Sequence, residues 1–366
     1  MTMQKKKLLF IIWSFSFGGG AEKILANIVN NLDYTKYDIE ILEYFRSEKI
    51  EKVSEQVKIL PPIVDMTKKD FLSKIHNKII HSVLIKLCPG LIRKMVLKKE
   101  YDVEISFNYL IPTFLLNKNS KKCIAWMHGA IYDLEDNKWL KKKQYRALSF
   151  VDKIVAISSE TEQSIIKLFP EYKNKIIKIY NGYDFAKMIP EGFVQDFQLL
   201  YCNRFDQNKN PLKFIAIVKK LNDFGLNVSA KMLGSGVLLE EAVKLIKEYH
   251  LENQIECIGY KKNPYIYYKQ CKVFCLTSKL EGFPTTLVEA MYFGKPFIST
   301  LVAGTEELAQ NGKCGFVENE DEEYAKKIYQ LLTNPKTYNE MSERCTEYVT
   351  KYSISNQISE LEKYCL

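Results

Sequence analysis

Two glutamates separated by seven residues mark the polar segment with the clearest chemical meaning. Glu281 and Glu289 enclose the sequence Gly-Phe-Pro-Thr-Thr-Leu-Val. The apolar run Val273–Leu276 ahead of them is typical of a buried strand, and a helix is expected to begin at about Pro284. Glu281 would then lie in a loop and Glu289 near the second turn of the helix. This offset favours two separate contacts with ligand hydroxyl groups over the paired carboxylates of glycoside hydrolysis.

Two cations follow another expected strand, Gln198–Cys202. Arg204 and Lys209 would therefore lie at the carboxyl end of that strand. They could neutralise a diphosphate, with the arginine binding two oxygens and the lysine acting as a point charge. Ordinary surface charge explains this pair equally well by itself. The sequence contains no Asp-x-Asp motif, so we expect no metal site and expect these cations to act in place of a divalent ion.

Other loops after expected strands carry glycine, tyrosine or histidine. Gly19 and Gly20 lie in a glycine turn between a strand and a helix, where the backbone can approach an anion closely. The turn is neither a GxGxxG motif nor a P-loop, and a plain tight turn is the alternative. Gly234 and Tyr260 follow two later strands, and Tyr260 could line a pocket for a base. His128 follows a strand in the first half of the chain, where a lone histidine is usually structural.

Strand-like and helix-like runs alternate from end to end, which predicts parallel sheets with crossover helices. The expected strands are Leu8–Trp13, Ile39–Tyr44, Val103–Phe107, Cys123–Met127, Ile154–Ile157 and Ile176–Tyr180, followed by Gln198–Cys202, Val228–Leu233, Ile255–Ile258, Val273–Leu276, Phe297–Thr300 and Gly315–Val317. Asn210, Asn334 and Ser353 are expected to cap helices. The two series predict two Rossmann-like domains divided near Ala186–Gly192, with ligands outside the carboxyl ends of the strands.

The composition is that of a globular protein. The chain has 366 residues, of which 46% are hydrophobic and 27% charged, so we expect two domains and exclude collagen, coiled coil and extended disorder. Nine cysteines without a CxxC pair indicate reduced thiols and a cytoplasmic location. No apolar run reaches the roughly 18 residues that span a bilayer. Lys5–Ile12 resembles the start of a signal peptide, but the amphipathic helix after the glycine turn favours a mature α/β domain.

The net charge of +9 is concentrated in one segment, residues 67–99. Its nine basic residues are Lys68, Lys69, Lys74, Lys78, Lys86, Arg93, Lys94, Lys98 and Lys99. Asp70 is the one acid, and apolar residues are interleaved with the cations, a pattern that suits an anionic membrane surface. A solvated helical face over an ordinary core is the alternative. Nucleic acid is disfavoured as a partner, because aromatic residues do not alternate with the basic ones.

The motifs, taken in order, resemble those of the retaining glycosyltransferases of GT-B fold, family 4, of the bacterial surface-polysaccharide type. Glu281 to Glu289 resembles the E-x7-E motif of that family. The other matching segments are Gly18–Glu22, His128–Gly129, Asn181–Asp184, Arg204 with Lys209, Gly234–Gly236, Gly294–Pro296 and Gly304–Glu307. The resemblance covers about residues 8–365. Asn203 and Ala303 stand where glycines are common, and residues 61–100 match nothing specific.

The resemblance implies an α/β fold of two Rossmann-like domains facing a central cleft. Residues 1–187 would bind the acceptor, residues 188–349 the nucleotide sugar, and a helix within residues 350–366 would cross back to the first domain. Glu289 would hold the ribose, Glu281 and His128 the transferred sugar, and Arg204 with Lys209 the diphosphate. The wider donor site would comprise Gly19, Gly20, Gly234, Tyr260, Phe283, Thr285 and Thr286.

The reaction implied by the resemblance is transfer of a hexose or N-acetylhexosamine from a nucleotide diphosphate sugar, with UDP favoured, to a lipid-linked glycan acceptor. The product would belong to cell-surface lipopolysaccharide or capsule. The enzyme would need no cofactor or metal and would lie peripherally on the inner face of the cell membrane. An epimerase or phosphorylase of the same shape remains an alternative, as does a non-catalytic nucleotide-binding assembly protein at the membrane. The missing GxGxxG motif disfavours a nicotinamide oxidoreductase.

Overall fold

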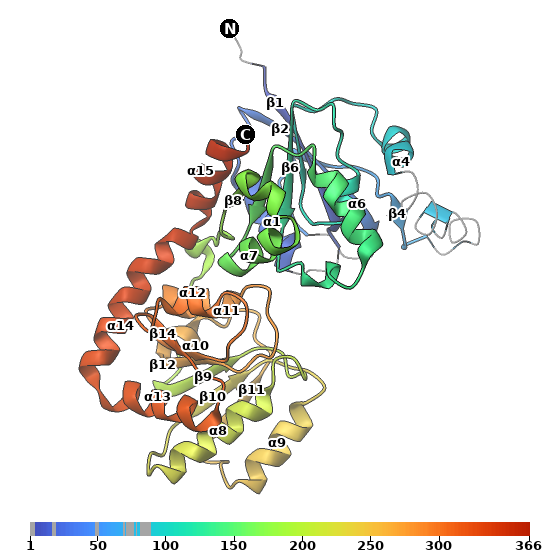
Figure 1. The fold of residues 1–366 in the computed structure, drawn as a ribbon. Helices are drawn as coiled ribbons and strands as arrows, with labels where there is room; N and C mark the ends of the chain where they lie inside the picture. The colour runs from blue at the N-terminus through green and yellow to red at the C-terminus, as the bar shows by residue number, and fades with distance from the viewer. Residues whose placement is uncertain are drawn as a thin grey trace. The chain divides into compact units, whose positions relative to one another are not determined.

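The computed structural model describes residues 4–16, 20–47, 51–68, 70, 77, 79–80 and 89–366. The chain divides into two compact units (Figure 1). The first unit comprises residues 1–183 with 352–366, and the second comprises residues 184–351. The sequence predicted divisions at 187/188 and 349/350, within a few residues of these positions.

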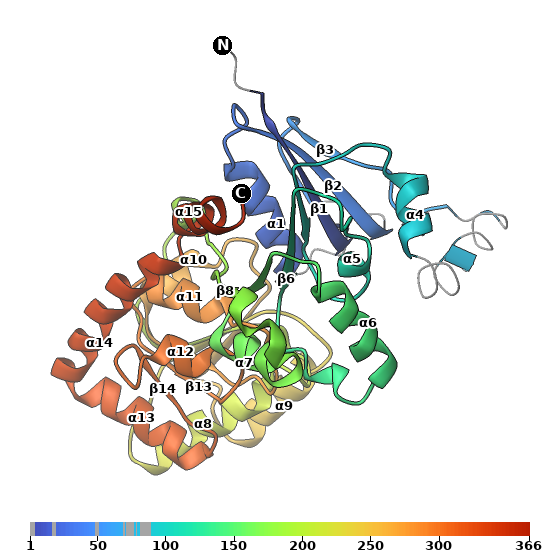
Figure 2. The ribbon, with the colours of Figure 1, turned by 45° about the horizontal axis from the view of Figure 1, so that its top comes forward.

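The first unit is built on one parallel sheet (Figures 1 and 2). Its strands are β1 (Lys6–Ser14), β2 (Tyr37–Arg46), β3 (Val57–Ile59), β4 (Val64–Asp65), β5 (Val103–Ser106), β6 (Lys122–Met127), β7 (Lys153–Ala156) and β8 (Ile176–Lys178). The strand order is β3-β2-β1-β5-β6-β7-β8, and β4 pairs with β2. Residues 8–12 of β1 are all buried, as expected for a parallel strand that is covered on both faces.

Helices fill most connections between these strands, and one more helix at the end of the chain joins the same unit. They are α1 (Gly20–Asn31), α4 (Pro89–Val96), α5 (Ile111–Phe114), α6 (Lys138–Leu148), α7 (Ser159–Leu168) and α15 (Ile354–Tyr364), with the 3-10 turns η2 (Tyr132–Leu134) and η3 (Pro170–Lys175). The buried residues of α1 include Leu25, Ile28 and Val29, which form the apolar face of the amphipathic helix predicted after the glycine turn.

The last helix, α15, packs against α1 in the first unit, as predicted from the resemblance (Figure 2). A parallel bridge joins Tyr183 to Ser353 just ahead of α15. A side chain on Gly182 would put its Cβ 2.8 Å from the Cβ atom of Gln357 and 2.8 Å from the backbone of Ile354. Glycine is therefore required there, because the chain entering the second unit passes directly over α15.

The second unit is also a parallel sheet with crossover helices. Its strands are β9 (Phe197–Cys202), β10 (Ala230–Leu233), β11 (Ile255–Gly259), β12 (Cys271–Leu276), β13 (Phe297–Ser299) and β14 (Gly315–Val317). Its helices are α8 (Pro211–Asp223), α9 (Leu239–Glu248), α10 (Tyr265–Gln270), α11 (Thr285–Tyr292), α12 (Thr305–Ala309), α13 (Asp321–Thr333) and α14 (Pro335–Tyr348), with the 3-10 turn η4 (Phe185–Lys187); η5 (Val349–Tyr352) leads into the first unit.

The strand order of the second unit is β11-β10-β9-β12-β13-β14. Strands β10 and β11 are added on one side of β9, and strands β12 to β14 are added on its other side. The chain leaves β9 toward β10 on one side and reaches β12 on the other. The two connections therefore part at the carboxyl ends of β9 and β12, where doubly wound folds bind their ligands. The loops after these two strands are Asn203–Lys209 and Thr277–Glu281, so the topology brings two of the predicted motifs to one point.

Three local predictions meet different outcomes. Asn334 and Ser353 cap α14 and α15 by accepting backbone hydrogen bonds from Thr337 and Asn356. The prediction for Asn210 is wrong: its backbone is left-handed with φ 49° and its side chain makes no capping hydrogen bond, so Pro211 alone starts α8. The loop in front of α8 turns too sharply for the extended conformation that a capping asparagine needs.

The membrane prediction for residues 67–99 needs a correction at Arg93. Arg93 is 8% exposed, and its Nη2 donates to Glu104 of β5 at 2.6 Å. Its Nη1 donates to the Leu115 carbonyl oxygen at 2.8 Å. A buried arginine with both ends occupied anchors α4 to the sheet and cannot reach a membrane. Lys69, Lys74, Lys78 and Lys86 lie outside the described residues.

Candidate functional site

The loop after β9 is held in shape by Asp206. Its Oδ1 accepts hydrogen bonds from the backbone amides of Asn208 and Lys209, at 3.0 and 2.9 Å. This is the turn in which a short acidic side chain satisfies amides two and three residues ahead. The hydroxyl of Tyr201 lies 2.9 Å from the Arg204 carbonyl oxygen and 3.3 Å from that of Lys209. Burial raises the pKa of Tyr201, so the phenol stays a protonated donor.

The loops after β9 and β12 are tied to each other through Asn208. The Lys279 amide donates to its carbonyl oxygen at 2.7 Å, and its Nδ2 donates to the Leu280 carbonyl oxygen at 3.0 Å. The Thr277 hydroxyl lies 2.9 Å from the Asn210 carbonyl oxygen. These bonds fix the relative position of the two loops, and so of the side chains they carry.

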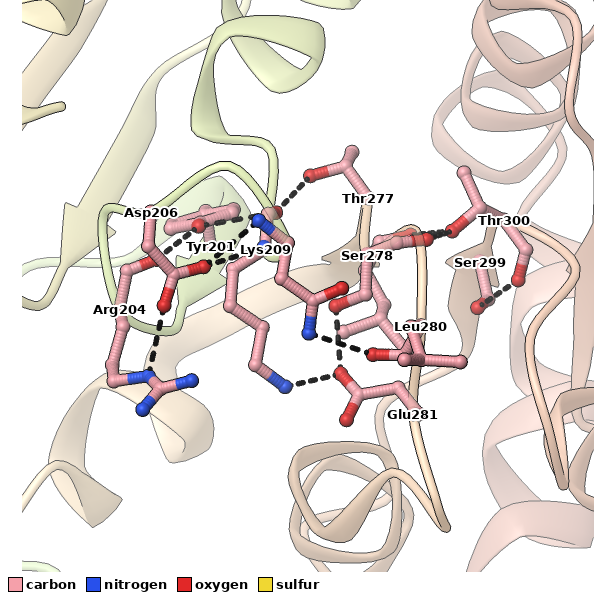
Figure 3. Close-up of polar contacts among 12 residues, drawn as sticks. Tyr201, Arg204, Asp206, Lys209, Thr277, Ser278, Leu280, Glu281, Ser299 and Thr300 are labelled. Atoms are coloured by element: carbon pink, nitrogen blue, oxygen red, sulfur yellow. Dashed lines mark hydrogen bonds and ion pairs between the residues drawn. The ribbon is translucent and has the colours of Figure 1, made fainter. Parts of the chain in front are cut away.

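Lys209 and Glu281 meet at the centre of this arrangement (Figure 3). Lys209 Nζ lies 2.5 Å from Glu281 Oε1, and the Ser278 hydroxyl donates to the same oxygen at 2.7 Å. The two charged side chains are 15% and 12% exposed. Both contacts use Oε1, so Oε2 is available to a ligand hydroxyl, and the lysine ammonium has three N–H donors, of which this contact uses one.

Arg204 lies in the same loop but in a different environment. Its Nε is 3.1 Å from Asp206 Oδ2, and its side chain is 72% exposed (Figure 3). An exposed ion pair of this kind contributes on the order of 1 kcal/mol or less and is easily exchanged for another anion. The guanidinium is therefore free to turn toward a ligand oxygen, whereas Lys209 is already held in place.

Helix α11 carries the second glutamate of the motif. Thr285 and Thr286 form its first turn, and Glu289 lies further along the helix, half-buried. The Tyr268 hydroxyl, buried near Glu289, has a pKa raised by burial first and by the neighbouring Cys202 and Glu289 next. The phenol therefore stays neutral beside the carboxylate. α11 begins at Thr285, one residue after the predicted start.

Phe283 supports the loop ahead of α11 instead of presenting its ring. The residue is 8% exposed. Gly304, with φ 83°, lies so close that a Cβ there would meet the Phe283 ring at 2.6 Å. Glycine at 304 therefore gives the phenylalanine room, and a ligand could meet only the backbone of Phe283 and a small part of its edge.

The loop after β10 packs directly on the loop after β9. Gly234 has φ 139°, and a Cβ there would lie 1.8 Å from the Asn203 carbonyl oxygen. Gly236 has φ 153°, and a Cβ there would lie 2.4 Å from the Phe205 carbonyl oxygen. These glycines are needed for close backbone packing beneath the site. Tyr260, after β11, is 71% exposed and presents its ring to solvent.

His128 lies in the first unit, at the end of β6. Its ring stacks on Trp126 at an interplanar angle of 5° and lies 4.3 Å from the Phe107 ring, centroid to centroid. Nε2 is buried and has no hydrogen-bond partner within the part of the chain that the structure describes. Burial lowers the pKa of His128 to about 3, so the imidazole is neutral at physiological pH. The neutral ring could hydrogen-bond a ligand hydroxyl only after a movement that uncovers Nε2, because that atom is buried.

The structure thus brings together Lys209 and Glu281 from the predicted set. Arg204 lies in the same loop as Lys209, and Gly234 lies in the loop packed against it. Gly19 lies outside the described residues, and Gly20 is the exposed first residue of α1, with open space where a Cβ would lie. The sequence analysis missed Ser278 and Asp206. The Asp-x-Asn-Lys spacing after a strand signals a side-chain turn at Asp206; Ser278 gives no comparable signal.

No group of three or more His, Cys, Asp or Glu side chains is arranged to hold a metal ion in the described ranges. Likewise, no described helix is long and apolar enough to cross a membrane.

Comparisons with known proteins agree on one class of enzyme. Residues 187–351 match the family Glycosyl transferases group 1. An uncharacterised glycosyltransferase of Haemophilus influenzae is 26% identical over 97% of this chain and 98% of its own length. A Campylobacter jejuni α-1,4-N-acetyl-D-galactosaminyltransferase, named for a diphospho-undecaprenol-linked acceptor, is 26% identical over 93% of this chain and 94% of its own.

Solved structures share the fold over the whole chain. HepE of Anabaena, crystallised with UDP, has a TM-score of 0.74 at 15% identity and covers 98% of both chains. At that identity the likeness establishes the fold alone, which is the two-domain α/β architecture of GT-B glycosyltransferases. The group 1 match in the second unit, the relatives that extend over nearly the whole chain and this fold together indicate that the protein is a glycosyltransferase.

Proposed function

We propose that the protein is a retaining glycosyltransferase of family 4. In this proposal it transfers a hexose or N-acetylhexosamine from a UDP-sugar to a lipid-linked oligosaccharide during synthesis of a bacterial cell-surface polysaccharide. The observation that carries the proposal is the Lys209–Glu281–Ser278 contact at the carboxyl ends of β9 and β12. This contact supports the proposal because a cation and a carboxylate lie side by side at the carboxyl ends of the strands, where doubly wound folds bind ligands.

The arrangement matches the demands of sugar transfer from a nucleotide. Negative charge grows on the diphosphate as the glycosidic bond breaks, so cations held in place before the reaction stabilise the transition state. Lys209 is held by Glu281, and Arg204 can turn from Asp206 to a phosphate oxygen. Glu281 Oε2 would accept a hydroxyl of the transferred sugar, and Glu289 would hold the ribose. His128 Nε2 would meet the donor sugar.

For the rest of the donor site we propose the residues predicted from the sequence. Gly19 and Gly20 would allow the backbone to approach the ligand, whereas Gly234 would serve the site by letting the loop after β10 pack on the loop after β9. The first turn of α11 at Thr285 and Thr286 would offer amides to the diphosphate. Tyr260 and Phe283 would border the base. We propose that the enzyme needs no metal, because Lys209 and Arg204 supply the positive charge.

The names of similar proteins support the choice of donor and acceptor. HepE was crystallised with UDP, and the Campylobacter relative is named for a lipid-linked acceptor. Other relatives are named for capsular polysaccharide and lipopolysaccharide synthesis. An enzyme with a lipid-linked acceptor works at a membrane surface, so we place this protein at the inner face of the cell membrane, with residues 67–99 on the membrane side apart from the buried Arg93.

A donor screen followed by product analysis tests the proposal. The purified protein is heated with UDP-, GDP- and ADP-sugars, and a bound donor raises the melting temperature because it binds only the folded state. The UDP-hexose or UDP-N-acetylhexosamine that gives the largest rise is then used for transfer, with EDTA present. We expect an α-linked product from an α-linked donor. A β-linked product would refute retention, and a requirement for manganese would refute metal independence.

The Arg204→Ala and Lys209→Ala variants test the leaving-group role. Both substitutions should lower kcat more than they raise the KM for the donor, since the charge they stabilise grows in the transition state. A change in KM alone would show that they only bind the ground state.

A further inference from the structure

A cavity of about 640 Å³ opens in the first unit between α4, α6 and the segment after α5. Figure 2 shows α4, α5 and α6 as neighbours beside the sheet. Its walls come from three separate parts of the chain: residues 89–100, 114–119 and 143–150. None of the residues assigned to the donor site lines it, so it is a feature of its own.

The charge of the cavity is strongly one-sided. Its basic lining residues are Arg93, Lys94, Lys98, Lys99, Lys118, Lys143 and Arg146, and Glu100 is the one acidic residue among those that line it. Arg93 is neutralised by Glu104, and Lys99 by Glu40 at 2.7 Å. Four others, Lys94, Lys98, Lys118 and Arg146, form no ion pair with any residue in the described ranges. Lys94 lies on α4 and Lys98 just after it, Lys118 lies in the segment after α5, and Arg146 lies on α6.

The inner surface of the cavity is apolar. Its apolar lining residues are Leu97, Phe114, Leu116, Ala147 and Phe150. Lys143 Nζ lies 4.7 Å from the centre of the Phe114 ring and 5.1 Å from that of Trp139, so its cation links the cavity to the neighbouring tryptophan. A cavity for a small soluble anion would have polar walls, whereas this one combines unpaired cations with a hydrocarbon floor.

Large apolar side chains stand out from the same two helices. Leu91 and Met95 of α4 are 55% and 66% exposed, and Trp139 of α6 is 50% exposed. Tryptophan with flanking lysines is the composition that lies at the boundary between lipid headgroups and acyl chains. The exposed apolar residues therefore point to the same partner as the cavity.

We propose that the α4–α6 cavity binds the phosphate headgroup of an anionic phospholipid and docks the first unit on a membrane surface. Lys94, Lys98, Lys118 and Arg146 contact the phosphate, and the apolar lining residues cover the glycerol carbons. Trp139, Leu91 and Met95 enter the interface beside them. The site includes α6 and Lys118, which lie outside the basic segment 67–99. The proposal rests on the membrane placement proposed above, but not on the donor sugar or on the stereochemistry of transfer, which the donor screen tests separately.

Two double variants of equal charge test the cavity as a unit. One is Lys94→Gln with Lys98→Gln, from α4 and its end; the other is Lys118→Gln with Arg146→Gln, from the opposite wall. The matched control is Lys244→Gln with Lys247→Gln, two exposed lysines of α9 in the second unit. Binding of the full chain is measured by flotation with phosphatidylcholine vesicles, with and without phosphatidylglycerol. The melting temperature of each variant shows that it is folded.

We expect binding to need phosphatidylglycerol and to weaken as salt is added. Each cation near an anionic surface strengthens binding about fivefold, so each cavity variant should bind about thirtyfold more weakly. The vesicle affinity of the control variant should stay within a few-fold of that of the unmodified protein, because Lys244 and Lys247 do not line the cavity. If only the variant with Lys94 and Lys98 replaced lost binding, the basic segment 67–99 would explain membrane attachment, and the proposal that the cavity binds the headgroup would be refuted. Equal losses in all three variants, or equal binding to neutral vesicles, would also overturn it.

Tryptophan fluorescence gives an independent measurement. Trp126 is fully buried and Trp13 is 39% exposed, so Trp139 is the most exposed of the three. On addition of phosphatidylglycerol vesicles, emission should shift to shorter wavelength in Trp13→Phe and stay unchanged in Trp139→Phe. The opposite pattern would show that a different face meets the lipid.

Discussion

Ser278→Ala isolates a residue that acts on the site through Glu281. The substitution removes the hydroxyl that donates to Glu281 Oε1 at 2.7 Å and leaves Lys209 on the same oxygen. Glu281 is 12% exposed, so water replaces the lost donor poorly. A hydrogen bond to a charged group contributes about 1.5–3 kcal/mol. The lower figure applies, since Lys209 still neutralises the carboxylate, and about 1.4 kcal/mol corresponds to a tenfold change in rate.

The expected result is a kcat/KM about tenfold lower, measured from the initial rate of nucleoside diphosphate release with a donor and an acceptor. Without Ser278, the carboxylate can swing with Lys209 and no longer holds Oε2 in one direction for the sugar. Ser278→Thr keeps the hydroxyl and should restore most of the activity.

Ser299→Ala is the matched control. Ser299 is as buried as Ser278, and its hydroxyl donates to the Thr300 carbonyl oxygen at 2.7 Å without touching Glu281 (Figure 3). Both alanine variants should lose similar stability, but only Ser278→Ala should lose activity at a temperature where both are folded. Equal losses of kcat/KM in the two variants, or a loss below twofold in Ser278→Ala, would refute the positioning role.

Three further predictions concern other parts of the site. Glu289→Ala should weaken nucleotide binding measured by calorimetry while the melting temperature changes little; unchanged affinity would remove Glu289 from the donor site. Gly234→Ala should destabilise the second unit by roughly 2–4 kcal/mol in urea unfolding, because a side chain would meet a carbonyl oxygen at a strained φ. Gly192→Ala is the control, because Gly192 has φ 84° but open space where a Cβ would lie. It should lower the free energy of unfolding by about 1 kcal/mol, which is the backbone strain alone. His128 has its pKa lowered by burial to about 3, so the unfolded chain binds the proton more readily and stability should fall as the pH drops from about 6.5 toward 3. The melting temperature of His128→Gln should fall less over that range, and an identical pH profile would show that the imidazole is not neutral through burial.

The sheet could be predicted from the sequence because its strands are distinct apolar runs. All twelve predicted strands are present, from β1 to β14. The two that were missed, β3 (Val57–Ile59) and β4 (Val64–Asp65), have three residues and two. Segments this short are too short to show the alternation of apolar and polar residues that marks a strand. They are strands only because they pair with β2.

The candidate site was predictable in its parts but not in its contacts. The motif around Glu281 and the cations after β9 were visible in the sequence, yet nothing in it indicated that Lys209 would contact Glu281 directly. That contact depends on the path of two loops, which Asn208 fixes through backbone hydrogen bonds. Ser278 was missed for the same reason, since a serine after a strand is common and its importance follows only from what it touches.

The pairing of Lys209 with Glu281 gives the site a defined electrostatic state. A lone charge as little exposed as these would carry a large desolvation cost, so each needs the other. The two residues lie 72 positions apart and are delivered by strands that pair directly, with Leu199 beside Val273 and Leu200 beside Phe274. Neither loop can form the contact alone. The site therefore exists only once β9 and β12 have paired, and a displacement of β12 along β9 would separate the cation from the carboxylate before it disturbed the apolar core beneath them.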